Sequence, residues 1–470
     1  MRANRQEAAS RTDGSSMIAV ARQHGMIAVS RMGIERSTLA GFAEVRAVKV
    51  RRFPMAEALR TANFRLFWIG ETVSLFGNQF YIVAFPWLAL RLTESGLALG
   101  TLFMTMAVAR AIFTLIGGAV TDRFSPRMVM IAANAVRGVV MAVLALLVFT
   151  NAIRMWQMYV LAMVYGIFDA FFFPAYKALL PRILPPGQLE GGNALLQGSS
   201  ELAVSVGPAL IGWAMGFGLA LQAALAIDAL SFWFSVLTLF LIRLLEAPQQ
   251  TSSGTLLRSI KEGISYSFSS PRLRAFILNL TVLNFAMVGP FGIGIAVLAK
   301  QHFGNTASFG ILFSAIAVGA LVGNIIAGTL QGSYKFGTTL IVMAVNTGIG
   351  VILLGVVSSL AWLSAVLAVM GCINAITGVL SFSMLQKMIE QNMMGRVMSL
   401  VMMGRTGIAP LSYLFAGLTI RLGVSALFLI SGSVVLLASI YTVVNYRLWS
   451  SSERTDALRV DQGGAFVGPK

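Results

Sequence analysis

The stretch Gly118-Ala119-Val120-Thr121-Asp122-Arg123-Phe124-Ser125-Pro126-Arg127 is a short charged interruption in a long apolar part of the sequence. Apolar runs flank it at 97–119 and 128–149. Each run is long enough to cross a bilayer as a helix, which takes roughly 20 residues. The stretch therefore predicts a basic turn between two membrane spans.

Further apolar runs lie on both sides of this turn. Of the 470 residues, 57% are hydrophobic and 11% are charged, whereas a soluble globular protein has roughly 25% charged residues. This excludes a disordered chain, a disulfide scaffold and an ordinary soluble enzyme. Continuous runs favour helices over a barrel, so we expect an all-α integral membrane protein with twelve transmembrane helices. The expected spans are 66–90, 97–119, 128–149, 156–178, 194–214, 221–242, 275–298, 309–330, 338–358, 361–384, 397–420 and 424–445.

The basic residues are distributed very unevenly between the two sides of these spans. An even number of spans places both termini on one side, and that side carries 28 of the 35 Lys and Arg residues. The opposite loops carry four: Arg91, Arg154, Lys300 and Arg421. Basic loops stay in the cytoplasm, so both termini are predicted to be cytoplasmic. The net charge of +17 then reports orientation, and we expect the lipid bilayer rather than nucleic acid as a partner.

The spans divide the chain into five regions. Residues 1–54 form a basic cytoplasmic extension, which we expect to be disordered or to precede the true start; a lipid-binding arm is the alternative. Six-helix halves follow at 55–242 and 275–446, and 447–470 is a cytoplasmic tail. Between the halves, 243–274 is a cytoplasmic linker whose apolar positions from Leu256 to Phe268 recur at helical spacing, which predicts an amphipathic helix at the membrane surface.

The two halves resemble each other weakly. Residues 179–184 precede the fifth span, residues 384–389 precede the eleventh, and each segment leads into a proline-containing helix. Two six-helix halves around a midplane cavity form a transporter architecture. The repeat therefore indicates a pseudo-symmetric transporter with its binding site between the halves.

The opening stretch resembles the Gly-x-x-x-Asp-Arg-x-x-x-Arg loop signature of the major facilitator superfamily. The resemblance implies a gating loop made of Gly118, Asp122, Arg123 and Arg127. Gly118 would permit close helix contact, and Asp122 would face the positive end of another helix. The two arginines would supply charge and partners for carboxylates. The alternative is a basic turn that only sets topology.

Other stretches resemble the branch of that superfamily that contains macrolide-efflux pumps and enterobactin-type exporters. They are 63–68, 85–88, 178–181, 227–232 and 395–400. The stretch 207–212 partly resembles the Gly-Pro motif of antiporters. The resemblance implies an exporter that works as a monomer.

Several ionisable residues fall inside the spans, where they are costly and are functional candidates. Asp169 and Glu201 are the predicted proton-coupling residues, and Arg110 is expected to pair with one of them; a permanent ion pair that only joins helices is the alternative. Arg405 is the second predicted cavity charge, either for an anionic substrate or for a carboxylate of the other half. Glu71 is expected near the inner surface in a structural role, Arg137 is expected to be structural, and Asp228 is expected to cap the sixth span.

Aromatic, thioether and amide side chains complete a predicted substrate cavity. Adaptable Met side chains suit promiscuous binding, although an aromatic stripe can equally be helix packing. The predicted substrate-binding residues are Tyr81, Phe85, Phe172, Phe285, Met287 and Asn284.

The predicted function is secondary active export of amphiphilic small molecules such as drugs, macrolides or siderophores. It would proceed by alternating access, with protons as the coupling ion, in a bacterial inner membrane. A lipid or lysolipid translocator and a non-transporting receptor or scaffold are the alternatives. No enzyme, cofactor or metal is expected, because the chain has two His and one Cys residue and lacks a Walker A motif.

Overall fold

The computed structural model describes residues 54–243, 265, 271–330, 336–389, 393, 397, 401, 404 and 407–441. The chain divides into two compact units, Met1–Pro54 and Met55–Lys470, and all the membrane spans belong to the second. The predictions for residues 1–53, for the amphipathic helix at 256–268 and for the tail at 447–470 lie outside the described residues.

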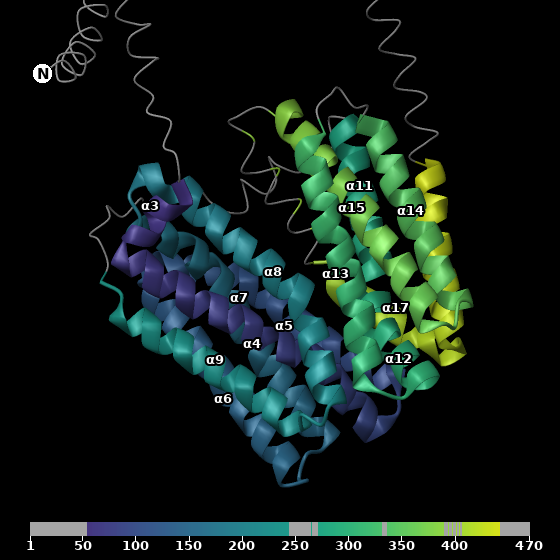
Figure 1. Ribbon diagram of the computed structural model, residues 1–470, viewed down its shortest axis with the longest axis horizontal. Coiled ribbons are helices and arrows are strands. Elements are labelled where there is room, and N and C mark those ends of the chain that lie inside the picture. Colours follow the sequence, from purple (N-terminus) through teal and green to yellow (C-terminus); the bar gives the residue numbers. More distant parts are fainter. Residues whose placement is uncertain are drawn as a thin grey trace, which may run out of the picture. The chain divides into compact units, whose positions relative to one another are not determined.

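The N-terminal half consists of long helices joined by short connections, and Figure 1 shows them in purple to teal. Apolar runs of 20 to 30 residues form these helices because a helix satisfies every backbone polar group within itself. In chain order they are α3 (Pro54–Arg60), α4 (Ala62–Thr93), α5 (Gly96–Arg123), α6 (Pro126–Phe149), α7 (Met155–Ile183), α8 (Leu189–Gly216) and α9 (Leu221–Leu241).

The C-terminal half repeats this plan and appears in green to yellow in Figure 1. One span is interrupted at Pro290, which removes a backbone donor, and five residues there form a π-turn. The elements are α11 (Pro271–Gly289), the π-turn η2 (Pro290–Gly294), α12 (Ile295–Phe303), α13 (Thr306–Thr329), α14 (Phe336–Val356), α15 (Leu360–Met388) and α17 (Ala409–Thr419). A last helix spans Val424–Tyr441.

The predicted all-α membrane fold is confirmed. Among the described residues, eleven helices are long and apolar enough to cross a membrane, and Ala409–Leu422 is a shorter apolar helix. These twelve helices fall on the twelve predicted spans. The eleventh is short because only single residues between 390 and 406 are described. Among the spans that are described throughout, the largest difference in bounds is in the seventh, which was predicted at 275–298 and extends from Pro271 of α11 to Phe303 of α12.

Successive spans run in opposite directions, so the helix ends gather on two sides of the membrane. We call the side at which α4 begins the terminal side and the opposite one the distal side. Apolar side chains cover the outer surface of the bundle; for example, Leu146, Leu230 and Leu437 are 60%, 68% and 66% exposed. Such exposure would be costly in water and is the expected surface inside a bilayer.

The two halves meet through small residues near the distal side. Gly100 of α5 faces Gly417 of α17, and a Cβ atom on Gly100 would lie 2.6 Å from the Cα atom of Gly417. Gly212 of α8 faces Gly310 of α13 in the same way, with a distance of 2.5 Å from a Cβ atom on Gly212 to the Cα atom of Gly310. Only glycine permits backbones to approach this closely. One turn further in, the rings of Phe103 and Tyr413 stack at 5.2 Å.

A basic residue also joins the halves at the distal side. The Lys300 Nζ of α12 donates a hydrogen bond of 2.6 Å to the backbone oxygen of Leu90 in the last turn of α4. It also lies 3.5 Å from a carboxylate oxygen of Glu94. A cation at a helix C-terminus is favoured by the carbonyl groups that end there. The Lys300 contact therefore holds the end of α4 to the C-terminal half.

Candidate functional site

Three of the charged residues inside the spans form one cluster where α5, α6 and α7 meet. A guanidinium nitrogen of Arg110 lies 3.3 Å from one oxygen of Asp169, and one of Arg137 lies 3.0 Å from the other. A single carboxylate thus bridges two arginines. Of the two partners predicted for Arg110, the structure brings Asp169 to it and not Glu201.

The cluster continues from Arg137 into a buried polar network. Arg137 donates to the amide oxygen of Asn134, and the Asn134 amide donates to the Ser235 hydroxyl at 2.9 Å. Ser235 in turn donates to Glu71 at 2.9 Å. Four helices, α4, α6, α7 and α9, are thereby joined through the interior of the N-terminal half. Glu71, expected near the membrane surface, is 3% exposed and belongs to this network.

The Arg137 guanidinium is enclosed by aromatic rings. It lies 4.3 Å from the ring centroid of Phe172 and 4.6 Å from that of Phe232. Both distances are within the range of a cation–π attraction, which is strongest where water is excluded. Phe172, predicted to bind substrate, therefore contacts Arg137 in this conformation.

Tyr81 and Phe85, also predicted to bind substrate, are packed inside the N-terminal half. The Tyr81 hydroxyl lies 3.0 Å from the sulfur of Met106, and its ring stacks on Tyr165 at 5.0 Å. Phe85 packs against Tyr81 at 4.7 Å and is 1% exposed. A substrate could reach these rings only after the helices move, and their part in binding stays a prediction.

The predicted binding residues of the C-terminal half lie together on α11. Asn284, Phe285 and Met287 are all half-buried, and the Asn284 amide donates to the Leu280 carbonyl of its own helix at 2.8 Å. The Phe285 ring packs on Phe415 at 5.0 Å. These side chains therefore stay partly accessible. Arg405 lies outside the described residues.

Glu201 stands apart from the charged cluster. It is exposed and accepts a hydrogen bond of 2.7 Å from Gln197 of the same helix. It lies one turn before Ser205, whose hydroxyl donates to the Ala317 carbonyl of α13 at 3.3 Å. Residues four apart share a helix face, so Glu201 lies on the face of α8 that is turned toward the C-terminal half.

The gating-loop residues are only partly described. Gly118 and Asp122 belong to α5, but the surroundings of their side chains are outside the description. Arg123 is exposed. Arg127 donates hydrogen bonds of 2.7 and 2.6 Å to the carbonyl oxygens of Leu239 and Phe240. Among the residues whose side chains are described, its partners are thus two carbonyl groups in the last turn of α9.

One residue was misplaced by the sequence reasoning. Asp228 does not cap a helix, because α9 begins at Leu221 and places it in the interior of the helix. It is completely buried, and neither carboxylate oxygen has a hydrogen-bond partner. The signal that could have revealed this is the spacing of Ser231, Ser235 and Thr238 after it, which marks a polar stripe on an otherwise apolar helix.

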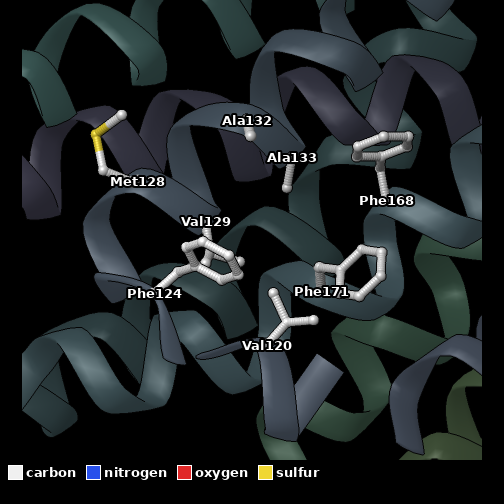
Figure 2. Close-up of a pocket in the computed structure, with 8 residues that line it drawn as sticks. All are labelled: Val120, Phe124, Met128, Val129, Ala132, Ala133, Phe168 and Phe171. Carbon is white, nitrogen blue, oxygen red and sulfur yellow. The ribbon is translucent and has the colours of Figure 1, made fainter. Parts of the chain in front are cut away.

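A separate apolar cavity of about 370 Å³ lies beside the gating loop. Figure 2 shows side chains of α5, α6 and α7 around it. None of its lining residues is polar, and none was predicted to bind substrate. They are Val120, Phe124, Met128, Val129, Ala132, Ala133, Phe168 and Phe171. Among the described residues, no cluster of His, Cys, Asp or Glu could hold a metal ion.

Two six-helix halves with charged side chains at membrane depth are the architecture of a membrane transporter. Residues 67–413 match the family model of the Major Facilitator Superfamily, and the chain belongs to this family. The resemblance seen in the sequence is thereby confirmed.

Relatives with known roles are distant. Macrolide efflux protein A of Streptococcus pyogenes is 24% identical over 385 residues, which cover 80% of this chain and 94% of the relative. The multidrug efflux pump Tap of Mycolicibacterium fortuitum is also 24% identical, over 79% of this chain and 93% of its own length. The enterobactin exporter EntS of Citrobacter koseri is 24% identical over 71% of this chain and 79% of the relative.

Solved structures show the same fold. The nucleoside transporter NupG superposes with a TM-score of 0.66 at 12% identity, over 82% of this chain and 99% of that one. A bacterial homologue of the iron transporter ferroportin superposes with a TM-score of 0.63 at 16% identity, over 82% and 98% of the two chains. This protein is thus a multi-pass membrane transporter of the superfamily, with drug, macrolide and siderophore exporters among its distant relatives.

Proposed function

We propose that this protein exports amphiphilic small molecules of the drug, macrolide or siderophore type from the bacterial cytoplasm, in exchange for protons. It would do so as a monomer in the inner membrane, with both termini in the cytoplasm. The efflux roles of the three relatives support the direction and the substrate class. The basic residues on the terminal side support the orientation.

The observation that carries this proposal is the placement of the contacts between the halves. The glycine pairs Gly100–Gly417 and Gly212–Gly310 close the distal ends of α5, α8, α13 and α17. Arg110 lies on the face of α5 that carries Gly100 and Phe103, and Glu201 lies on the corresponding face of α8. Both charged side chains stand nearer the terminal side than these contacts. A substrate from the terminal side would therefore meet them first, in a conformation closed to the distal side.

Alternating access would move the substrate across. The distal contacts between glycines would separate, and the terminal ends of the same helices would come together. Protons entering the cell can drive this cycle, because one charge crossing about 100 mV releases about 2.3 kcal/mol. Asp169 and Glu201 are the carboxylates that the sequence suggested for coupling. In this conformation Asp169 is held by two arginines, and Glu201 only by Gln197.

A lipid or lysolipid translocator is the second candidate function. The apolar cavity of Figure 2 favours it, because Phe124 and Met128 on its rim are 62% and 53% exposed on the outer surface of the helices. Such a cavity could take an acyl chain directly from the bilayer. The buried charges of α5, α6 and α7 do not line this cavity, so it explains less of the structure.

Retention of known compounds in cells tests the export proposal. An efflux-deficient bacterium would express the wild-type protein, Asp169→Asn or the control Glu190→Gln, which changes an exposed acid in the first turn of α8. Ethidium, erythromycin and enterobactin would each be loaded with and without an uncoupler. We expect the wild type and the control to lower retention of at least one compound severalfold, the uncoupler to abolish this, and Asp169→Asn to lose it.

The same experiment can reject the proposal. Unchanged retention of all three compounds, with normal amounts of protein in the membrane, would contradict small-molecule export. Transfer of a fluorescent lysolipid between leaflets of reconstituted vesicles would then decide for the lipid translocator. Export that persists in the presence of the uncoupler would contradict coupling to protons.

A further inference from the structure

Helix α9 carries a continuous buried polar stripe on one face. Asp228, Ser231, Ser235 and Thr238 follow one another at intervals of three or four residues, the spacing of one helix face. All four are 5% exposed or less. At a rise of 1.5 Å per residue the stripe is about 15 Å long, and it runs from the middle of the membrane toward the terminal side. An apolar helix needs no such stripe unless the polar groups have a role inside the protein.

Helix α4 faces this stripe with small residues and one acid. A Cβ atom on Gly70 would collide with the Thr238 hydroxyl, and one on Gly77 would collide with that of Ser231. The same atom on Gly77 would lie 3.4 Å from a carboxylate oxygen of Asp228. Between these positions Glu71 accepts its hydrogen bond from Ser235. Two carboxyl groups, those of Glu71 and Asp228, therefore share one narrow seam between α4 and α9.

The carboxyl group of Asp228 has no donor in this seam. The hydroxyl of Ser231 donates to the backbone oxygen of Asp228 at 2.8 Å, and neither carboxyl oxygen of Asp228 has a hydrogen-bond partner. Two tyrosines lie near Asp228, and their hydroxyl groups have other partners. The hydroxyl of Tyr81 of α4 contacts the sulfur of Met106. Tyr165 of α7 donates to Asn78 at 3.0 Å.

Arg137 of α6 is the neighbouring positive charge of Asp228, and it donates hydrogen bonds to Asp169 and Asn134. Helix α9 has no other titratable residue, and the two acids of α8, Glu190 and Glu201, are exposed. The Asp228 carboxylate thus has a positive charge nearby but no hydrogen bond from it.

A count of charges shows what this arrangement requires. The interior of the N-terminal half holds three carboxyl groups, those of Glu71 and Asp169 in the network and that of Asp228 beside Arg137, but two arginines, Arg110 and Arg137. With every group ionised it would carry one net negative charge inside the membrane. Burying an uncompensated charge is far more costly than burying a neutral acid. One bound proton makes the cluster neutral. Asp169 has two arginine partners and Glu71 has a hydroxyl donor, which leaves Asp228.

We propose that Asp228 carries the coupling proton, and that Arg137 transmits its loss to the Asp169–Arg110 pair. This inference rests on the proposed proton-coupled export. When Asp228 releases its proton to water, its carboxylate attracts Arg137, which also holds Asp169. The ion pair between Arg137 and Asp169 weakens, and Asp169 then has Arg110 as its remaining partner. Arg110 lies on the face of α5 that is turned toward the C-terminal half. The proton site thereby lies between α4 and α9, away from the surface that meets the substrate.

Infrared spectroscopy of the purified protein in lipid vesicles tests this assignment without any substrate. A protonated carboxyl group gives a carbonyl-stretch band that ionised carboxylates lack, and this band shifts in heavy water. We expect one such buried group per chain in the wild type at neutral pH. The band should disappear in Asp228→Asn and remain in Glu71→Gln and in the control Glu201→Gln, which changes an exposed acid outside the cluster.

A second measurement needs no variant at all. The apolar reagent dicyclohexylcarbodiimide adds to protonated carboxyl groups in membranes, and peptide mass spectrometry locates the adduct. We expect Asp228 to be labelled at neutral pH, and labelling to fall when the pH is raised. Labelling of Glu71 or Asp169 in place of Asp228 would overturn the assignment even if Asp228→Asn does not fold.

The outcomes separate this inference from the proposed function. No band in the wild type, or a band lost only in Glu71→Gln, would overturn the assignment to Asp228 whether or not the protein exports anything. If the band belongs to Asp228, a second assay measures ethidium efflux driven by a pH gradient in vesicles. This efflux shows whether the proton of Asp228 is coupled to transport. In Asp228→Asn, we expect the gradient-driven rate of ethidium efflux to fall at least tenfold. Ethidium exchange without a gradient should remain. Equal gradient-driven rates in the variant and the wild type would overturn the coupling role.

Discussion

Removing the Lys300 side-chain charge should open the distal side of the transporter. In the structure, Lys300 Nζ donates a 2.6 Å hydrogen bond to the Leu90 carbonyl, and this bond joins the two halves. A hydrogen bond that involves a charged group is worth about 1.5 to 3 kcal/mol. The ion pair with Glu94 adds little, because the Glu94 side chain is 85% exposed and such pairs contribute about 0 to 1 kcal/mol.

The size of the expected effect follows from these values. Lys300→Met removes both interactions only from conformations that are closed on the distal side. With the lower figure of about 1.5 kcal/mol, the ratio of open to closed molecules should rise roughly tenfold, since about 1.4 kcal/mol is a factor of ten. Glu94→Gln removes the exposed ion pair alone, which is worth about 1 kcal/mol at most, and should raise the ratio about fivefold or less.

Distances between spin labels measure this ratio directly. The labels would be attached at Ala152→Cys and Ser358→Cys, two exposed positions at distal helix ends, one in each half. The single natural cysteine, Cys372, would be changed to serine. The population at long distance should grow in Lys300→Met and stay near the wild-type value in the charge-conserving Lys300→Arg. An unchanged distribution in folded Lys300→Met, or an equally large shift in Glu94→Gln, would show that the Lys300–Leu90 hydrogen bond does not hold the distal side closed.

Three further substitutions test other contacts. Gly100→Leu should abolish export, because the leucine side chain would collide with the backbone of α17. The control Gly198→Leu should export normally, because there is open space around Gly198. Equal efflux rates of the two variants would contradict the role of the distal glycine contact. Asp169→Asn should destabilise the purified protein by about 3 kcal/mol, since it leaves two arginines without their shared carboxylate. The control Glu201→Gln changes an exposed acid and should alter the stability by about 0.5 kcal/mol or less. Thermal unfolding in detergent compares the stabilities of the two variants. Arg127→Gln should lower the stability by about 1 to 3 kcal/mol in the same assay, because two carbonyl groups at the end of α9 lose their charged donor. An unchanged stability would show that water replaces the arginine as the donor.

The sequence was sufficient for the fold because hydropathy is a property of the chain alone. Each run of about 20 apolar residues must form a helix in lipid, whatever it packs against. The turn at 118–127 and the stretches around it were sufficient for the family. The intramembrane position of Arg110 and Asp169 was also evident, because a charge within an apolar run is visible without a structure.

The site could be predicted only in part, because its geometry depends on how each helix is rotated. Glu71 was expected near the surface, yet α4 begins at Ala62 and carries it into the interior. Asp228 was expected to cap the sixth span, yet it lies seven residues after Leu221, where α9 begins, and is completely buried. Glu201 has the same chemistry as Asp169, but its helix face turns it away from the arginines.

The amino-acid sequence was enough to identify twelve apolar spans in two halves, and it predicts which side of the membrane holds the basic loops. Those features are sums over neighbouring residues. Only the tertiary structure decided that Asp169 bridges Arg110 and Arg137, that Ser235 connects Glu71 to Asn134, and that Asp228 is left without a donor. These depend on contacts between residues up to about 160 positions apart. Helix rotation, depth and close approach at glycines fix such contacts, and none of these is a property of a single helix.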